Sequence, residues 1–295
     1  MDDILIRGGQ VIDGTGAPAR TADVAIRAGR IVAIEADRAD SAERVIDAHG
    51  SVVAPGFIDI HTHSDFTLPL NPKAEGKIRQ GVTTEVVGNC GFSVAPALPG
   101  KVDALSEYLS GSAPWLTFEE TDFARYMDGW PDIAVNTVMQ VGHNTLRLMA
   151  MGMENRAPRE AELRHMQDML EEGLLAGALG LSSGLFTAPG SFSERDELRA
   201  LGRVLKAHGA RYSSHIRDES HAVHEAVAEA IDIALRRPCA DRPFEAVRDR
   251  QLGPGRSPSR RDRGRPRAGC RRARRPVSLR LGHQPAALPA ADLVA

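Results

Sequence analysis

The sequence predicts an α/β protein in which parallel strands alternate with crossover helices, preceded by a small all-β unit. Two observations predict this class. After Pro55-Gly56, a pattern of short strand followed by amphipathic helix repeats along the chain. Before that point, residues 3–54 hold short β-type runs separated by glycine-containing turns. The alternation fits either a (β/α) barrel or a doubly wound sheet.

The N-terminal unit is expected to contain strands at residues 4–6, 11–12, 24–26 and 31–34. Ala28-Gly29, between the last two runs, is typical of a tight hairpin turn. The apolar core of this unit is too thin to stand alone, because so few short strands bury little surface. We therefore expect it to complete its sheet with strands from elsewhere.

The region that follows is expected to contain five strands, at residues 57–63, 83–87, 136–141, 178–182 and 211–215. Helices are predicted at residues 159–175, 194–208 and 221–235. The first of these helices places Leu163, Met166, Met169 and Leu170 on one face. A closed barrel requires eight strands, so the sequence accounts for about five of the eight.

The pattern ends near residue 235, where the composition changes. Residues 1–235 have a net charge of -13, whereas residues 236–295 have 16 arginines, no lysine, eight prolines and a net charge of +11. This composition predicts a disordered tail. One interpretation is a basic arm for nucleic acid, but no aromatic platform or reading motif accompanies it, so no nucleic-acid partner is expected.

A second interpretation of residues 236–295 is a lost reading frame. Arginine, proline, alanine and glycine dominate GC-rich coding sequence that is read out of frame. Back-translation from Arg242, started one base later, recovers a strand-like run with a histidine and a lysine. The hypothesis is a one-base frameshift close to Arg236. Stop codons in the neighbouring frame of the gene would contradict it.

Composition narrows the class of protein further. Apolar residues make up 42% of the chain, and no run of about 18 apolar residues is present, so no membrane span is expected. The N-terminus does not resemble a signal peptide, which makes the cytoplasm the expected location. The odd number of cysteines, three, argues against a disulfide scaffold.

The strongest chemical motif is Asp59-Ile60-His61-Thr62-His63-Ser64-Asp65. Alternate side chains of a strand share a face, so His61 and His63 are expected to point the same way at the end of the first strand. Parallel β/α folds place their active sites at this end. Two neutral imidazoles on one face can bind a divalent cation, although a bare pair is more often two hydrogen-bonded histidines.

Cys90 follows the second strand within Gly88-Asn89-Cys90-Gly91. It is either a small buried apolar residue or, beside a metal, a thiolate ligand. The run at residues 53–65 resembles the signature of the amidohydrolase superfamily, in which most two-metal members bridge their ions with a carboxylated lysine. None of the four lysines of this chain falls on a predicted strand, so the resemblance implies that another residue bridges the ions, and Cys90 fits that role.

These motifs together resemble the N-acyl-D-amino-acid deacylase (D-aminoacylase) branch of the amidohydrolase superfamily. The resemblance covers residues 3 to about 235 and rests on the runs at residues 53–65, 86–91, 141–147, 180–185 and 214–219. It implies a TIM-type (β/α)8 barrel, of which residues 56–235 form part, and a small β-sandwich domain left incomplete by residues 1–55. It also implies a centre for one or two zinc ions with His61, His63, Cys90 and His215 as ligands. His143 is expected to be structural.

The activity that the resemblance implies is hydrolysis of an N-acyl-D-amino acid to a D-amino acid and a carboxylate. In this family an aspartate at the end of the last barrel strand moves the proton, and a histidine at the sixth strand completes the metal shell. Neither has a counterpart here, so the catalytic acid/base is unknown and activity of the chain as printed is expected to be impaired or absent. Where many relatives have tyrosine after Gly-Leu, this chain has Phe186-Thr187.

Two alternatives remain open from the sequence. A cyclic amide hydrolase of the dihydroorotase kind would need the carboxylated strand lysine. An inactive fragment, or a metal- or nucleic-acid-binding protein without catalysis, would show no turnover with zinc. The acyl group, the side-chain preference and the oligomeric state are not determined by the sequence.

Overall fold

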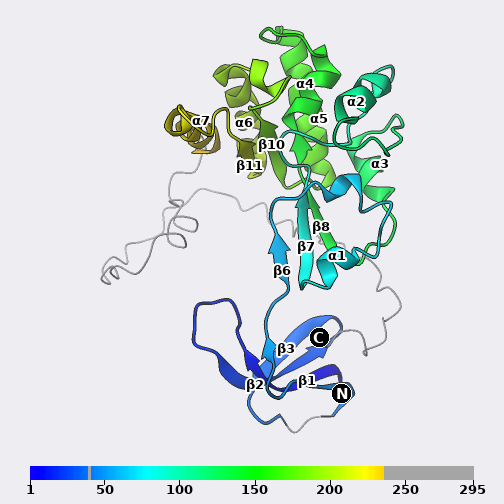
Figure 1. Cartoon of the computed structure of the whole chain (residues 1–295), viewed down its shortest axis with the longest axis vertical. Coiled ribbons are helices and arrows are strands. Elements are labelled where there is room, and N and C mark those ends of the chain that lie inside the picture. The colour runs from blue at the N-terminus through cyan, green and yellow to red at the C-terminus, as the bar shows by residue number, and fades with distance from the viewer. Residues whose placement is uncertain (39–40, 236–295) are drawn as a thin grey trace, which may run out of the picture.

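The computed structural model describes residues 1–38 and 41–235 (Figure 1). The arginine-rich segment 236–295, with its expected disorder and the hypothesis of a lost reading frame, lies outside the described residues. In Figure 1 the N-terminal sheet lies at one end of the described part and most of the helices lie at the other, with β6 between them.

The N-terminal sheet has five strands: β1 (Asp2–Val11), β2 (Arg20–Arg27), β3 (Arg30–Glu35), β4 (Ala42–Asp47) and β5 (Val52–Val53). The strand order is β3-β2-β1-β4, with β5 also pairing with β1. β1 and β2 are antiparallel, as are β2 and β3, whereas β4 and β5 run parallel to β1. The predicted turn at Ala28-Gly29 is confirmed: both residues have positive φ, 49° and 70°, and they connect β2 to β3.

This sheet buries little apolar surface, as the sequence predicts. Its core is a small cluster around Val11, Ala22 and Val24. Ile31 on β3 and Val52 on β5 are 63% and 61% exposed. The described residues provide one layer here, and completion of the sheet by strands from elsewhere remains a prediction.

The second part contains two three-stranded parallel sheets that meet at one residue. One consists of β6 (Phe57–Asp59), β7 (Val82–Val87) and β8 (Asn136–Met139), and the other of β9 (Val141–Gly142), β10 (Gly180–Gly184) and β11 (Arg211–His215). β8 pairs with β7, and β9, which begins after Gln140, pairs with β10 on the other side. All these pairs are parallel. Among the described residues the strands form open sheets, and no closed barrel is present.

Two of the five predicted strands differ from the structure in an informative way. The third is divided at Gln140, where its pairing changes from β7 to β10. The first was expected to reach His63, and this is wrong, because β6 ends at Asp59. The carboxylate of Asp59 accepts a hydrogen bond from the backbone N–H of His61 (3.2 Å), so a side chain replaces the neighbouring strand as the partner of that donor.

Nine helical segments lie among the described residues: η1 (Ser64–Phe66), α1 (Glu75–Ile78), α2 (Val102–Leu109), α3 (Phe123–Asp128), α4 (His143–Met151), α5 (Glu160–Ala176), η2 (Gly190–Phe192), α6 (Arg195–His208) and α7 (Val223–Leu235). The three predicted helices correspond to α5, α6 and α7, with ends that differ by one or two residues. None of the described helices combines the length and the apolar composition that a membrane span requires.

The main core lies where α4, α5 and α6 pack against each other and against the β9–β11 sheet. Leu181 of β10, Leu146 of α4, Leu170 of α5 and Leu201 of α6 are fully buried in it. Each such side chain contributes about 1.5–3 kcal/mol through burial. This core fixes the C-terminal ends of β9 and β10, beside which the candidate site lies.

Candidate metal centre

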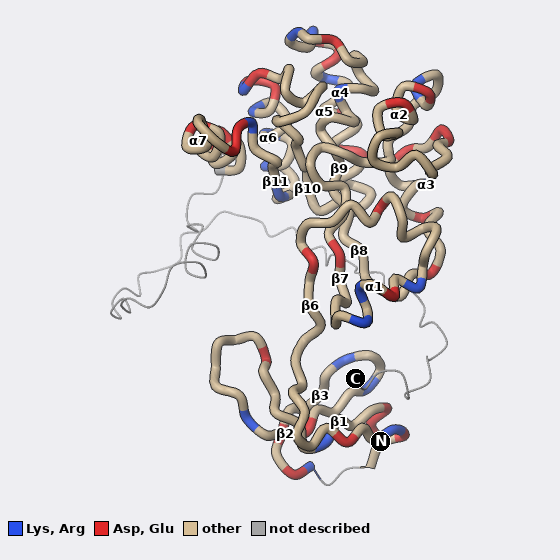
Figure 2. Tube along the Cα trace, in the orientation of Figure 1, with Lys and Arg blue, Asp and Glu red and all other residues tan. Residues whose placement is uncertain are grey.

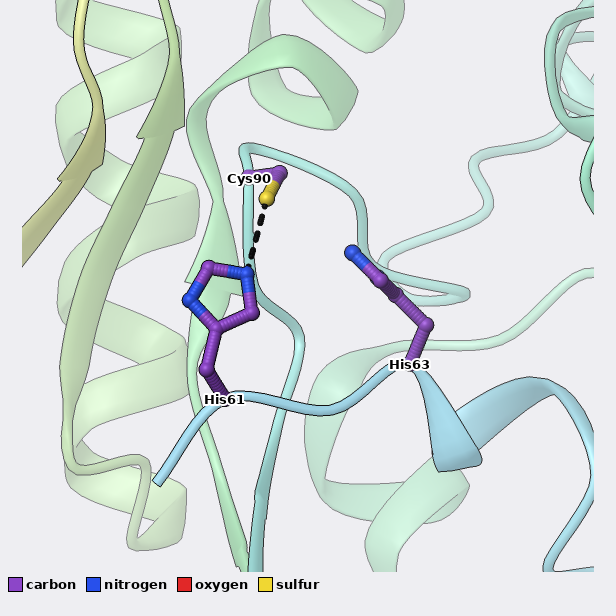
Figure 3. A group of neighbouring side chains, drawn as sticks. All are labelled: His61, His63 and Cys90. Atoms are coloured by element: carbon purple, nitrogen blue, oxygen red, sulfur yellow. Dashed lines mark hydrogen bonds between the residues drawn. The ribbon is translucent and has the colours of Figure 1, made fainter. Parts of the chain in front are cut away.

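Three potential metal ligands converge just beyond the ends of β6 and β7: His61, His63 and Cys90 (Figure 3). One ligand atom from each lies within 4.8 Å of the others. His61 Nε2 is 3.1 Å from Cys90 Sγ, and the two imidazole rings are 5.9 Å apart at an interplanar angle of 78°. We call these three residues the ligand group.

The two histidines meet through a loop and not through the strand alternation that the sequence predicts. Both follow the end of β6, and the chain turns into η1 directly after His63. The backbone N–H of Thr62 between them donates to the carbonyl of Val86 (3.3 Å), which holds this loop against β7. Figure 3 shows the two side chains on the same side of the loop, directed toward Cys90.

The loop that contains Cys90 is held in an unusual backbone conformation. Cys90 has a φ of 55°, a left-handed value that is uncommon for a residue with a side chain. Ser182 of β10 holds both ends of the turn: its hydroxyl donates to the carbonyl of Gly88 and accepts from the N–H of Gly91 (3.0 Å). A Cβ atom on Gly88 would lie 2.2 Å from the carbonyl oxygen of Gln140, so only glycine fits there. These contacts fix the direction of the Cys90 thiol.

His215 lies at the end of β11 and is not part of the ligand group. Its ring stacks on Phe186 with 5.5 Å between centroids, and its Nε2 is 3.5 Å from a carboxylate oxygen of Glu219. It pairs in register with Gly184, so it occupies the same edge of the sheets as the ligand group. The structure thus brings three of the four predicted ligands together and places the fourth at the same edge.

The protonation of the ligand group suits metal binding. Burial lowers the pKa of His63, and the neighbouring His61 and His215 lower it further, so the neutral ring is favoured near pH 7. Burial raises the pKa of the Cys90 thiol, and the charge of Glu219 adds to this effect. A divalent cation would displace the thiol proton and take the thiolate as a ligand.

The donor set also fits zinc. Two imidazoles and one thiolate are the ligand types that zinc prefers in proteins. Nδ1 of His63 is buried and has no hydrogen-bond partner among the described residues. Zinc-binding histidines normally use their second nitrogen for a hydrogen bond, so this atom is available either as a ligand or for a second contact.

Lys77 lies close to the centre, but in a different role from a bridging ligand. It is in α1, and its ammonium group is 2.6 Å from Asp59 and 3.4 Å from the buried Glu85. Its hydrogen bond with Asp59 lowers the pKa of that carboxyl and raises its own. Figure 2 shows the backbone positions: acidic positions on β6 and β7 lie beside basic positions at and just after α1. None of the four lysines lies on a described strand.

His143, predicted to be structural, has that role in the structure. It is fully buried at the start of α4, and its Nε2 is 2.7 Å from a carboxylate oxygen of Glu197 on α6. The same carboxylate pairs with the buried guanidinium of Arg147. His143 is therefore occupied by an internal ion-pair network away from the ligand group.

Asp65 is a buried polar residue to which the sequence pattern assigns no role. It follows His63 by two residues within the motif at residues 59–65 and directly precedes the apolar Phe66, and this position is the sequence signal of its burial. Only 3% of it is exposed, and its Oδ1 has no partner among the described residues. Burial raises the pKa of Asp65 to about 7, although the backbone N–H groups of Asp65 and Gly88 oppose the shift.

The stability of the metal-free chain is expected to reflect the titration of Asp65. Its pKa in the folded state, about 7, lies above the ordinary value of 3.8. The folded state therefore holds the proton more tightly, and the stabilisation is lost as the pH rises toward 7. From this group we expect the free energy of unfolding to fall by about 2–3 kcal/mol between pH 5 and pH 8.

Urea unfolding of the unaltered chain and of Asp65→Asn at pH 5, 6, 7 and 8 measures this effect as a difference, which removes the contribution of other groups. The gap between the two curves should close or reverse as the pH rises. Asp168→Asn, at an exposed position of α5, is the control and should run parallel to the unaltered chain. Parallel curves for Asp65→Asn would show that Asp65 is already ionised at pH 5.

Comparison with known proteins shows the family of the chain. Residues 44–244 match the sequence profile of the amidohydrolase family. The chain is 45% identical over 241 residues to N-acyl-D-glutamate deacylase of Alcaligenes xylosoxydans xylosoxydans, and 42% identical over 238 residues to D-aminoacylase of the same organism. These alignments cover 81% and 78% of this chain but 48% of each relative, so the chain spans about half the length of the curated relatives it matches.

Two solved structures are similar as well. One is N-acyl-D-glutamate deacylase from Bordetella bronchiseptica, complexed with zinc and a phosphonate inhibitor, with 44% identity and a TM-score of 0.71 over 79% of this chain and 48% of that one. The other is a D-aminoacylase, with 39% identity and a TM-score of 0.71 over 79% of this chain and 49% of that one. The profile match covers more than half of the chain, and both structures share its α/β fold. The chain therefore belongs to the amidohydrolase family.

Proposed function

We propose that this chain provides the metal-binding half of a zinc-dependent hydrolase that cleaves the linear amide bond of N-acyl-D-amino acids. The products would be a free D-amino acid and a carboxylate. The observation that carries the proposal is the convergence of His61, His63 and Cys90 within 4.8 Å at the ends of β6 and β7. The similarity to N-acyl-D-glutamate deacylase and D-aminoacylase supports the substrate class.

In this proposal His61, His63 and Cys90 hold one zinc ion, and His215 joins them when the centre is completed or a second ion is bound. Zinc would supply Lewis-acid polarisation of the amide carbonyl and activation of water. Cys90 gives up its proton on binding, whereas His63 is already neutral because burial lowers its pKa. Phe186 is 59% exposed beside His215 and offers an apolar surface to the acyl group.

We further propose that the chain as printed turns over slowly or not at all. Amide hydrolysis needs a group that transfers a proton to the leaving amine. Among the described residues, no carboxylate belongs to the ligand group, and the family resemblance puts the catalytic aspartate beyond residue 235. The cyclic amide hydrolase alternative is not favoured, because no described strand contains a lysine.

The test is to purify the chain, measure bound zinc by elemental analysis, and assay hydrolysis of N-acetyl-D-glutamate with N-acetyl-L-glutamate as the control. A second chain, in which the neighbouring reading frame replaces residues 236–295, is assayed beside it. We expect zinc in both chains and D-selective hydrolysis in the second. Hydrolysis by the chain as printed would contradict the assignment of the aspartate, and absence of zinc from both would contradict the proposed centre.

A further inference from the structure

A line of side-chain hydrogen bonds crosses the described strands directly beneath the candidate centre. Asn89 donates through Nδ2 to the carbonyl of Thr62 (3.0 Å). Gln140 donates through Nε2 to Oδ1 of Asn89 (2.9 Å). Ser213 donates through its hydroxyl to Oε1 of Gln140 (2.7 Å). Three hydrogen bonds thus connect the loop after β6 to β11.

Each end of this line lies next to candidate metal ligands. Thr62 stands between His61 and His63, and Asn89 directly precedes Cys90. At the other end, Ser213 is two residues before His215 on the same strand, so their side chains share a face of β11. The line therefore connects the ligand group to the fourth predicted ligand, although no ligand takes part in it.

Gln140 occupies the point where the two sheets meet. It separates β8 from β9, and its backbone N–H donates to the carbonyl of Val87 on β7 (3.1 Å). Its side chain is buried, with 3% exposed. The backbone of Gln140 is thus fixed to the sheet of β7, and its side chain joins Asn89 on that side to Ser213 on the other.

The chemistry of this position requires an amide. Gln140 donates to one neighbour and accepts from the other, and neither side-chain atom is unsatisfied among the described residues. A glutamate could accept from Ser213 but could not donate to Asn89 when ionised. A methionine has a similar length and makes neither hydrogen bond. In a buried network, such a loss leaves the former partners without hydrogen bonds, which is costly.

We propose that Gln140 is a positioning residue that sets the His61–His63–Cys90 group relative to His215, and thereby allows one metal centre to use ligands from both sheets. This inference rests on the proposed metal centre. Gln140 stands where the strand is divided, between β8 and β9, at the point where the pairing changes from β7 to β10. The test must therefore measure how Gln140 affects metal binding through His215, and not only how it affects stability.

Cobalt(II) alone is the probe, because its visible bands report coordination and its thiolate charge-transfer band reports Cys90. The band is assigned with Cys90→Ser. Cobalt affinity and spectra are then compared for the unaltered chain, Gln140→Met, His215→Ala and the double variant. We expect Gln140→Met to weaken cobalt binding about 10- to 100-fold, the usual effect of losing a group that orients ligands. The effects of Gln140→Met and His215→Ala should not add, because both remove the contribution of His215.

Two further variants test the inference if Gln140→Met folds poorly. Ser213→Ala breaks only the hydrogen bond toward β11 and should cause part of the same change, with the charge-transfer band retained. Gln167→Met on α5 removes a partly buried glutamine that donates to the carbonyl of Ala200 (3.2 Å), away from the centre, and should leave cobalt affinity within about twofold.

The outcomes separate the two proposals. A charge-transfer band that is absent even from the unaltered chain refutes the proposed centre, and the role of Gln140 with it. A band present in the unaltered chain, with unchanged affinity and visible spectrum in folded Gln140→Met and Ser213→Ala, overturns the inference and leaves the centre intact. Full additivity with His215→Ala also overturns it.

Discussion

Replacement of Cys90 by serine is expected to weaken zinc binding by a factor on the order of 100 or more. The thiolate is the only sulfur ligand of the group, and its turn is fixed by the two hydrogen bonds of Ser182. Another donor therefore cannot easily move into its place. A serine hydroxyl stays protonated near pH 7 and is a poor zinc ligand. Loss of a group that only orients a ligand already lowers metal affinity about 10- to 100-fold, so loss of a ligand itself should lower it at least as much.

Competition with a chromophoric chelator at constant pH measures this loss. His61→Ala should weaken zinc binding to a similar extent, because Nε2 of His61 lies 3.1 Å from Sγ of Cys90 and His61 belongs to the same group. His165→Ala is the matched control, since His165 is exposed on α5 and lies outside the ligand group. Equal zinc affinity in Cys90→Ser and the unaltered chain would remove Cys90 from the proposed ligands and leave His61, His63 and His215 to be tested as a three-histidine site.

At pH 7, zinc binding by the unaltered chain should also release about one proton more than zinc binding by Cys90→Ser does. Because burial raises the pKa of Cys90 and lowers that of His63, the additional proton comes from the thiol. Calorimetry in two buffers of different ionisation enthalpy measures the number released. Equal proton release by the two chains would show that the thiol does not give up a proton when zinc binds.

The candidate ligand residues can be predicted from the sequence, but the way in which they come together cannot. His61, His63 and Cys90 follow runs with a clear strand pattern, and parallel strands bring their ends to one edge. The strand-like residues do not stop where β6 ends, because Ile60 follows Asp59. Nothing in the sequence shows that the Asp59 carboxylate accepts the N–H of His61. That hydrogen bond is a local alternative to the sheet.

The buried helix α4 could not be predicted from the sequence, for a different reason. Helix α4 (His143–Met151) has no exposed face: every residue except Ala150 is buried. A surface helix is recognised by an apolar stripe opposite a polar, solvent-facing one, whereas the polar residues of α4 are buried together with its apolar ones. Its charged residue, Arg147, is fully buried, whereas an arginine is ordinarily expected to face solvent. The partner that makes this possible, Glu197, lies 50 residues further along the chain.

Glu197→Ala is expected to lower the free energy of unfolding by about 3–5 kcal/mol. Glu197 is 3% exposed on α6, and its carboxylate contacts His143 (2.7 Å) and the guanidinium of Arg147 on α4. Arg147 is fully buried and also donates to the carbonyls of Glu154 (3.2 Å) and Arg156 (3.0 Å). Removal of the carboxylate leaves a buried positive charge that carbonyl groups alone cannot compensate.

Urea unfolding at one pH measures the change, with Asp196→Ala as a neighbouring control. Asp196 is 86% exposed and pairs with Arg199 at 2.9 Å, so its loss should cost less than about 1 kcal/mol. The double variant Glu197→Ala/Arg147→Met removes the uncompensated charge and should be more stable than Glu197→Ala alone. A change below 1 kcal/mol for Glu197→Ala, or a double variant less stable than the single one, would show that Arg147 reaches water.

Glu197→Ala should also change the zinc affinity of the candidate centre, because α4 contacts the loop that contains Cys90. The N–H of Thr145 donates to the carbonyl of Gly91 (3.2 Å), and Asn144 contacts both the N–H and the carbonyl of Gly184 (3.3 and 3.2 Å). If Glu197 holds the start of α4 in place through His143, the zinc affinity of Glu197→Ala should be lower than that of the unaltered chain when both are fully folded. If affinity is unchanged while stability falls, then α4 is held at its N-terminus by Asn144 and Thr145 alone. The ion pair would then stabilise the packing of α4 against α6 without positioning the ligands.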